Sequence, residues 1–475
     1  MKRFLIIGLF AGLLAQSAMA QYGNQFQYNS FFKTTGSFEY PSELGTDIRT
    51  ISVNLFGSSM YLGNSVADVN WLYNFADQSS TALANNTNYL QGPNGEQYSI
   101  PHVLLDHMVN QTPETNYILG GGAVYPPLAI AFKVKTGEEK REIVTFSFNH
   151  KLKTAASYYF GKNLFRLLYN GNETFNGERV NLTDINLGVH AYREIGFGAA
   201  FPIIDLKGMG LRGGFNLKYL TGYGGLKTNN ADVFFQSSED GTNWTFEGDY
   251  RINAAYPDFD NINTGDLVRQ GIGTGIGIDV GASLQIWENL KAYMSINDLG
   301  AVTYGSDHST NLSSSGKVVF EGVRVNVFST DDITVNYDTL LTKFNPKETN
   351  EGFNIALPTR LVLGGEFGIN SKESKKGVEY FQHNLYFTYI QGFNRSPGNS
   401  VRPFINAGYG YRAGNVVSVG VNTGYGGIYG YNLGAFVALR GGPVRFALGS
   451  NAFLSGFVPN LAKGFDFSMN LGIAI

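Results

Sequence analysis

The sequence predicts an all-β protein, namely a transmembrane antiparallel β-barrel of about 14 strands (roughly 12–18), with an N-terminal plug or cap segment that contains short helices. Three observations predict this class. Segments in which apolar residues alternate with polar residues or glycine recur along most of the chain. Glycine and aromatic residues are abundant, whereas only 15% of the residues are charged. The chain also begins with the pattern of a secretory signal.

Residues 271–287 give the clearest strand. Ile276, Ile278 and Val280 belong to an apolar file, and Gly277 and Asp279 belong to the file between them. A period of two is the pattern of a β-strand with unlike environments on its two faces. The segment exceeds the usual strand of about five or six residues, and a tilted strand needs about 9–11 residues to cross a bilayer. We therefore interpret it as a transmembrane strand with its apolar file towards lipid.

Residues 1–20 have the three parts of a signal peptide. Lys2 and Arg3 form a positive start, an apolar core follows over residues 4–14, and residues 18–20 (Ala-Met-Ala) form a small-residue cleavage site. The alternative is an N-terminal membrane anchor, but the apolar core is short for a spanning helix. The chain contains no cysteine, so a lipidated N-terminal cysteine, disulfides and thiolate metal sites are excluded.

Residues 21–116 lack the alternation, apart from a candidate strand at 48–56. Residues 66–75 and 103–108 have the apolar spacing of short helices, and each needs a surface to bury against. Such a long segment without strands is either a plug or capping subdomain or a long surface loop. We predict a plug or cap, and residues 117–475 are then the barrel.

The barrel segments after residue 117 include strands over residues 246–254 and 318–328, and a helical turn over 163–169. Short connections near the end of the chain contrast with long polar connections earlier, which is typical of barrels in the outer membrane. The 60 glycines, 28 tyrosines and 36 phenylalanines fit the same class. The formal net charge of −3 gives no reason to expect nucleic acid as a partner. We therefore predict the cell outer membrane as the location and outer-membrane lipid as a partner.

Charged residues in the polar files are expected to face the lumen, because a lipid-facing Lys or Arg costs roughly 2–4 kcal/mol at mid-bilayer. They form either a network of ion pairs that braces a filled lumen or the lining of a solute path. Arg212 and Arg251 are the candidate partners of Asp279. The complete set of lumen-facing candidates is Glu194, Arg212, Lys218, Arg251, Asp279, Arg360, Glu366, Arg402, Arg412 and Arg445.

No pattern in the chain predicts an enzyme. The glycines at 271–277 do not have the spacing of a phosphate-binding loop, and no helix follows them. His102 and His107 are five residues apart, whereas ligands on one helical face are three or four apart. We therefore predict no catalytic residue, no metal site and no cofactor.

Three stretches carry a resemblance to a known family. They are HAYREIGFG at 190–198, KYLTG at 218–222 and SINDLG at 295–300, and the last contains the motif residues Asn297, Asp298, Leu299 and Gly300. The chain resembles a family of Bacteroidota outer-membrane proteins that carries only a domain-of-unknown-function label and is related in architecture to long-chain fatty-acid transporter barrels. The resemblance implies a barrel with an N-terminal plug. The Asn-Pro-Ala motif of the fatty-acid transporters proper is not found near the mature N-terminus, which argues against lipid transport.

Two functions remain open at this point. One is a gated channel that passes a hydrophobic or amphiphilic small molecule, with the N-terminal region as the gate. The other is a structural or assembly partner of an envelope or secretion machine that transports nothing. A continuous path through the lumen favours the channel, whereas a lumen filled by ion pairs favours the partner.

Overall fold

The structure is a computed structural model of the whole chain. It describes residues 40–474 except 45–49, 86, 88, 92–95, 112–115, 138–140, 183–184, 207–208, 241–242, 258–270, 321–346, 374–378, 415, 429, 454–459 and 461. The predicted signal peptide and most of residues 21–49 lie outside the described residues. None of the described helices is both long and apolar enough to cross a bilayer.

In the described part of the chain, fourteen antiparallel strands form a closed barrel, which confirms the predicted fold class and strand number. Around the ring the order is β1 (Ile51–Asn64), β4 (Asn116–Thr136), β5 (Arg141–Gly161), β7 (Asn186–Leu206), β8 (Met209–Ser237), β10 (Gly273–Trp287), β11 (Leu290–Tyr304), β15 (Arg360–Glu373), β16 (Glu379–Gly392), β17 (Phe404–Ala413), β18 (Val417–Gly426), β19 (Gly430–Gly441), β20 (Val444–Ser450) and β21 (Gly464–Ala474).

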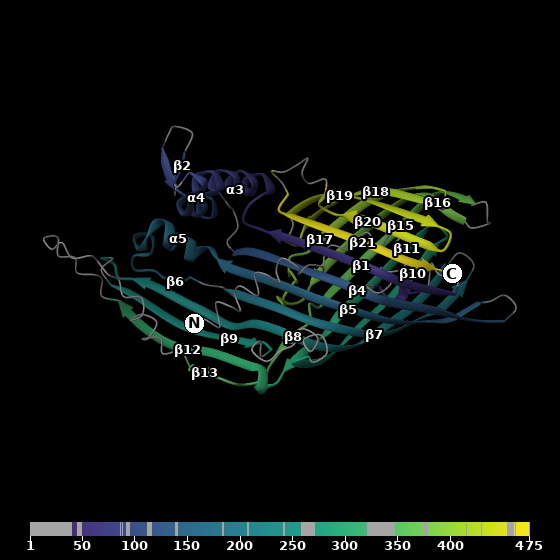
Figure 1. Cartoon of the computed structure of the whole chain (residues 1–475), viewed down its shortest axis with the longest axis horizontal. Coiled ribbons are helices and arrows are strands. Elements are labelled where there is room, and N and C mark those ends of the chain that lie inside the picture. Colours follow the sequence, from purple (N-terminus) through teal and green to yellow (C-terminus); the bar gives the residue numbers. More distant parts are fainter. Residues whose placement is uncertain are drawn as a thin grey trace.

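Strand β1 closes the ring, because it pairs with β21 on one side and with β4 on the other (Figure 1). It lies inside the range 21–116 that we assigned to a plug or cap, so that boundary is wrong and the barrel begins at Ile51. The sequence pattern misled us because glycine and serine residues interrupt the alternation over residues 57–59. Closure leaves the barrel without an unpaired edge strand.

The barrel wall has its apolar residues outside and its polar residues inside. On β10, Ile276 is 67% exposed, whereas Asp279 is 1% exposed. Phe197, Phe215 and many other large apolar side chains are likewise exposed on the outer face. The buried residues of the wall include asparagine, serine and lysine side chains. This distribution is the reverse of that in a soluble barrel, whose apolar side chains fill the interior.

The two ends of the barrel differ in their connections. At one end, here called the turn end, short turns join β4 to β5, β7 to β8, β10 to β11, β15 to β16, β17 to β18 and β19 to β20. At the other end, the loop end, the connections are long except that between β18 and β19. The longer helices lie at the loop end, and the last strand of the ring ends at the turn end (Figure 1).

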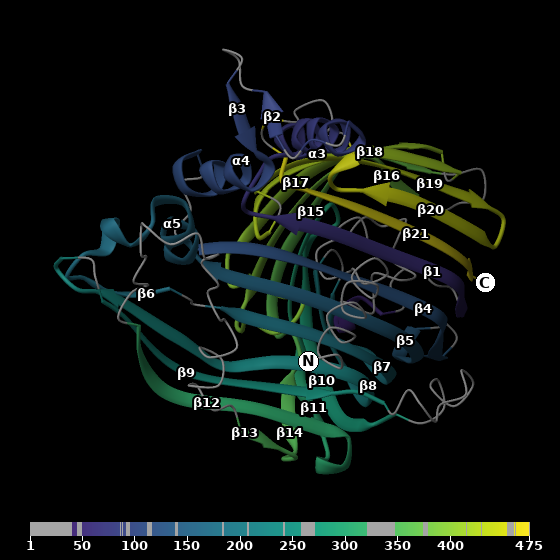
Figure 2. The ribbon, with the colours of Figure 1, turned by 60° about the vertical axis from the view of Figure 1, so that its left-hand side comes forward.

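A smaller sheet extends the wall beyond the ring at the loop end (Figure 2). Its members are the last part of β8 together with β6 (Arg179–Asn181), β9 (Trp244–Ala255), β12 (Ser309–Phe320) and β13 (Lys347–Thr349). The short strand β14 (Phe353–Ala356) pairs with β11 just before β15. The segments 246–254 and 318–320 therefore form strands as predicted but belong to this extension and not to the ring, while 321–328 lie outside the described residues.

The connection from β1 to β4 contains the predicted helices. These are α3 (Val69–Ala84), α4 (Ile100–Asp106) and the π-helix η3 (His107–Gln111), with the hairpin of β2 (Tyr89–Gln91) and β3 (Gln97–Ser99) between them. The helical turn after β5 is α5 (Lys162–Asn170), followed by η4 (Asn172–Phe175). The remaining short elements are η2 (Pro41–Glu43) and η5 (Ser306–His308). Helices exist at all three predicted places.

Trp71 explains how α3 and η3 are held together. The Asp68 carboxylate caps α3 by accepting a hydrogen bond from the Trp71 backbone N–H at 2.8 Å. The Trp71 ring stacks on His107, with 3.9 Å between ring centroids. Both nitrogens of His107 contact polar atoms, Gln111 Oε1 at 3.1 Å and the Val66 carbonyl at 3.2 Å. His107 therefore has a structural role here.

Candidate functional site

A set of buried charges lies on one continuous part of the inner wall, and we call it the ionic arc. Its side chains come from the neighbouring strands β5, β7, β8, β10 and β11, and each is at most 7% exposed. Charges of opposite sign alternate in space, so that every lysine contacts at least one carboxylate. The members are Lys151, Lys153, Glu194, Lys218, Asp279 and Asp298.

Lys218 is the centre of the ionic arc. Its Nζ lies 2.5 Å from Asp279 Oδ1, 2.6 Å from Asp298 Oδ1 and 3.7 Å from Glu194 Oε2. Lys153 Nζ contacts two of these carboxylates through the same oxygen atoms, at 2.9 Å from Glu194 Oε2 and 3.1 Å from Asp298 Oδ1. Lys151 adds a contact to Glu194 at 3.5 Å. The charges thus share partners, as buried charges must when water is excluded.

The motif Asn297–Gly300 creates the bulge that brings Asp298 into the arc. The register between β10 and β11 shifts between Ile278 and Val280, opposite this motif. Asp298 has a φ of 57°, a left-handed conformation that aspartate tolerates better than most residues. Its N–H donates to Asp279 Oδ1 at 2.7 Å, and its carbonyl accepts from Thr359 Oγ1 at 2.8 Å.

Gly300 completes the bulge. Its φ is 149°, and a Cβ at this position would lie 2.1 Å from the Ile276 carbonyl oxygen of the neighbouring strand. The motif that carries the family resemblance therefore has a structural explanation. It bends β11 and fixes a carboxylate between two lysines.

The predicted lumen-facing residues divide into groups. Glu194, Lys218, Asp279, Arg360 and Arg445 are buried inside the barrel. Arg212, Glu366 and Arg412 line a cavity at the turn end. Arg402 lies half-buried in the connection between β16 and β17.

Arg251 does not face the lumen, and this prediction was wrong. It lies on β9 in the sheet extension, where its half-exposed guanidinium pairs with Glu351 at 2.5 Å. Neither Arg212 nor Arg251 is the partner of Asp279, because Lys218 takes that place. The alternation over 246–254 is real, but periodicity cannot distinguish a strand of the ring from a strand of the extension.

The sequence analysis missed Lys151 and Lys153. The signal was present, because the polar file of β5 runs from Thr145 through Ser147 and Asn149 to both lysines. Continuing the alternation past Phe148 would have placed them on the inner face. Among the described residues, no group of three His, Asp or Glu side chains is placed to hold a metal ion.

Residues 40–44 lie inside the barrel and are fastened by Arg212. The guanidinium of Arg212 donates to the Ser42 carbonyl at 3.1 Å, to the Leu44 carbonyl at 3.0 Å and to the Glu142 carboxylate at 2.8 Å. Lys291 pairs with Glu43. We call this arrangement the N-terminal clasp.

A glycine and a tyrosine of the inner wall allow the clasp to pack closely against it. A Cβ at Gly214 would lie 2.3 Å from the Pro41 carbonyl, so only glycine permits the chain to lie this close to β8. Tyr40 packs against Tyr293 with 4.7 Å between ring centroids. Within the described residues, the part of the predicted plug that lies inside the barrel is the short buried segment 40–44, next to the turn end.

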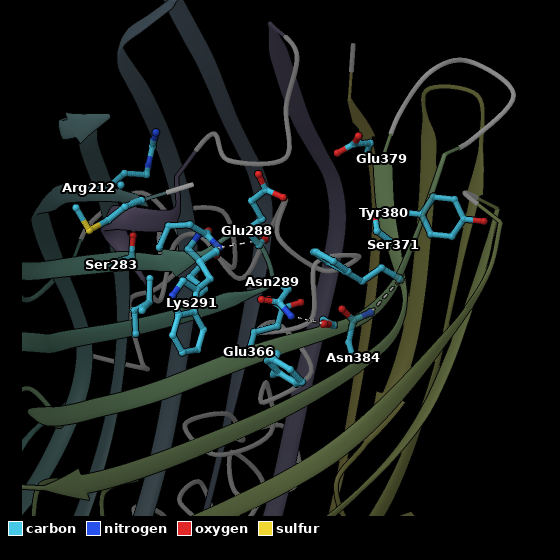
Figure 3. Close-up of a pocket in the computed structure, with 18 of the residues that line it drawn as sticks. Arg212, Ser283, Glu288, Asn289, Lys291, Glu366, Ser371, Glu379, Tyr380 and Asn384 are labelled. Carbon is cyan, nitrogen blue, oxygen red and sulfur yellow. Dashed lines mark hydrogen bonds between the residues drawn. The ribbon is translucent and has the colours of Figure 1, made fainter. Parts of the chain in front are cut away.

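A cavity of about 1520 Å³ opens at the turn end beside the clasp. Arg212, Ser283 and Lys291 lie on one side of it, and Glu379, Tyr380 and Asn384 lie across from them (Figure 3). Apolar side chains, among them Ile204, Met209, Trp287 and Phe367, complete its lining. The cavity thus combines charged and apolar walls.

Comparisons with known proteins give a family but no established activity. No curated protein matches the chain. Among solved structures, it is similar to the toluene transporter TbuX of Ralstonia pickettii, with 11% identity, 92% of each chain covered and a TM-score of 0.41. It is also similar to a FadL homologue of Pseudomonas aeruginosa, with 9% identity, 96% of this chain and 99% of that chain covered, and a TM-score of 0.41. Residues 50–451 match the model of the Family of unknown function (DUF5723), and the chain therefore belongs to that family.

Proposed function

We propose that the protein is an outer-membrane β-barrel. Three observations support the proposal: the apolar outer face of the closed ring, the contrast between short turns and long loops, and the predicted signal peptide. An exposed apolar surface of this extent would be unfavourable in water, whereas lipid tails would cover it. The origin of the family in the Bacteroidota remains a prediction from the sequence motifs.

We further propose that the barrel is a gated channel for hydrophobic or amphiphilic small molecules. The observation that carries this proposal is the cavity at the turn end, whose mixed lining suits a molecule with one apolar and one polar part. The N-terminal clasp lies beside the cavity, inside the lumen. A solute that moves between the cavity and the lumen would have to displace residues 40–44, so the clasp is the proposed gate at this end.

Arg212→Ala tests this function, because it removes every hydrogen bond that the guanidinium makes to the clasp and to Glu142. Reconstituted into liposomes, the variant should take up a small amphiphilic fluorophore several-fold faster than the unmodified protein. Arg251→Ala is the matched control, since it removes an arginine outside the ring. Equal uptake by both variants and the unmodified protein would contradict a gate at the clasp.

The second candidate is a structural or assembly partner in the envelope. It is favoured by the ionic arc, which occupies the lumen with paired charges, and by the sheet extension, which offers surface beyond the ring. Under this hypothesis, Arg212→Ala leaves the liposomes impermeable, and another envelope protein co-purifies with the barrel in mild detergent in a fixed ratio.

A further inference from the structure

The connection between β16 and β17, residues 393–403, leaves the wall and enters the lumen. Its first residue, Phe393, is 55% exposed, whereas Asn399 is 2% and Ser400 is 0% exposed. A connection at the rim of a barrel is normally exposed to solvent along its length. This one is buried at its tip, and we call it the strap.

The tip of the strap is bonded to strands on the far side of the ring. The Tyr61 hydroxyl of β1 donates to the Gly398 carbonyl at 2.9 Å, and the Tyr159 hydroxyl of β5 donates to the Asn399 carbonyl at 2.7 Å. At least four strands of the ring separate β16 and β17 from β1 and β5 in either direction. The tip of the strap therefore lies inside the lumen, within reach of tyrosines from distant strands.

The opposite wall is also shaped for the tip. A Cβ at Gly188 of β7 would lie 2.8 Å from Pro397 Cγ, so a glycine at 188 allows the proline ring to rest against the strand. The Arg395 guanidinium lies over the Tyr159 ring, 5.4 Å from its centroid. These contacts define a seat for the tip on β1, β5 and β7.

The base of the strap is tied to its own side of the barrel. Asn394 Nδ2 donates to the Leu357 carbonyl at 2.8 Å. From the tip, Asn399 Nδ2 also donates to the Thr359 carbonyl at 3.1 Å. The Phe393 N–H donates to the same Thr359 carbonyl at 2.9 Å. The two tyrosine bonds at the tip are bonds between neutral groups, which water can replace at modest cost once the tip leaves its seat.

We propose that the strap is the gate of the lumen at the loop end, and that Tyr61 and Tyr159 are the residues that hold it closed. The proposal deepens the channel function and rests on it. Opening is the release of the tip from β1, β5 and β7, which also breaks the bond from Asn399 to Thr359, while Phe393 and Asn394 remain attached beside β15. The barrel then has a gate at each end, the clasp at the turn end and the strap at the loop end. Because neutral hydrogen bonds hold its tip, the strap opens transiently, so loss of the clasp in Arg212→Ala still raises uptake.

A thiol reporter at Ser400 tests the opening without any need for transport. The chain has no cysteine, so Ser400→Cys introduces a single thiol at a buried position of similar size. In this background, Tyr61→Phe with Tyr159→Phe should raise the rate of labelling by a water-soluble maleimide roughly tenfold, because two neutral hydrogen bonds are lost. Tyr386→Phe is the matched control: that buried hydroxyl donates to the Val421 carbonyl at 3.3 Å and does not touch the strap.

A disulfide lock tests whether the strap gates the lumen. Gly188→Cys with Pro397→Cys joins the tip to its seat, where the two positions are in contact. In the Arg212→Ala background, oxidation should stop uptake of the amphiphilic fluorophore, and reduction should restore it. Equal labelling of the double-Phe variant and the Tyr386→Phe control overturns the role of the tyrosines. Equal uptake in the oxidised and reduced states overturns the gate, whereas no uptake in any state refutes the channel itself.

Discussion

Asp298 offers the most direct test of the ionic arc. Asp298→Asn keeps the shape of the side chain and tolerates the same left-handed backbone, but it removes the negative charge between Lys218 and Lys153. Removing one partner of a buried ion pair costs about 3–5 kcal/mol. Each lysine keeps another carboxylate, Asp279 at 2.5 Å or Glu194 at 2.9 Å. We therefore expect a loss of about 3 kcal/mol in the free energy of unfolding, at the lower end of that range.

Comparing Asp298→Ala with Asp298→Asn separates the effect of the lost charge from the effect of the left-handed backbone. Its φ of 57° is unfavourable for alanine, which adds about 1–2 kcal/mol to the loss seen with asparagine. Urea unfolding of the barrel in lipid vesicles, followed by tryptophan fluorescence and gel migration, measures both variants. Asp249→Asn, an exposed carboxylate in the sheet extension, is the control. If Asp298→Asn lowers the free energy of unfolding by no more than the ~1 kcal/mol expected for a surface ion pair, the ionic arc does not stabilise the bulge.

Two further changes examine the wall and the loop end. Ile278→Arg places a charge on the outer face of β10 and should cost roughly 2–4 kcal/mol, whereas Thr274→Arg near the strand end should cost about 1 kcal/mol or less; equal losses in vesicle unfolding would argue against a bilayer around β10. Hydrogen bonds from Asn110 and Tyr169 lower the pKa of Asp106 below its ordinary value of 3.8. A carboxyl with a lowered pKa stabilises the folded form above its unfolded pKa, so the contact between α4 and α5 should persist at neutral pH and weaken as the pH falls below about 4. The protection factors of the α5 amides, measured by hydrogen exchange at pH 7 and pH 3, test this expectation. Tyr169→Phe should remove the difference between the two protection factors.

Periodicity predicted the wall of this barrel well because it is a local property. The two files of β10 lie as the alternation indicates, with Ile276 and Ile278 outside and Asp279 inside. Periodicity did not reveal that β9 leaves the ring, because membership of the ring depends on pairing between distant segments. It also places Gly277 on the inner face without showing what lies against it, and a Cβ there would lie 2.9 Å from Leu357 Cδ1. An arginine at 277 would therefore not be tolerated in the way that a lumen-facing glycine suggests.

The candidate site was harder to predict, since it depends on which inward residues meet. The polar file contains Glu194, Lys218 and Asp279, yet nothing local showed that one lysine contacts all three acidic side chains of the arc. The bulge at Asp298 moves that carboxylate out of simple alternation. The strap was not predicted at all, because residues 393–403 have the composition of an ordinary loop. Only the tertiary structure shows that its tip reaches Tyr61 and Tyr159.

The inner wall is divided into two chemically different parts. Opposite the ionic arc, β17 to β21 carry a network of amides in which Asn422 Nδ2 donates to Asn406 at 3.1 Å and to Asn451 at 3.0 Å. Asn451 in turn donates to Asp466 at 2.8 Å, and that carboxylate also accepts from the Ser450 hydroxyl and the Ala452 N–H. Bonds between neutral groups are worth about 1 kcal/mol each, whereas breaking a buried ion pair costs several. The arc is therefore the rigid part of the wall, and a rearrangement that admits a solute costs least on the amide side.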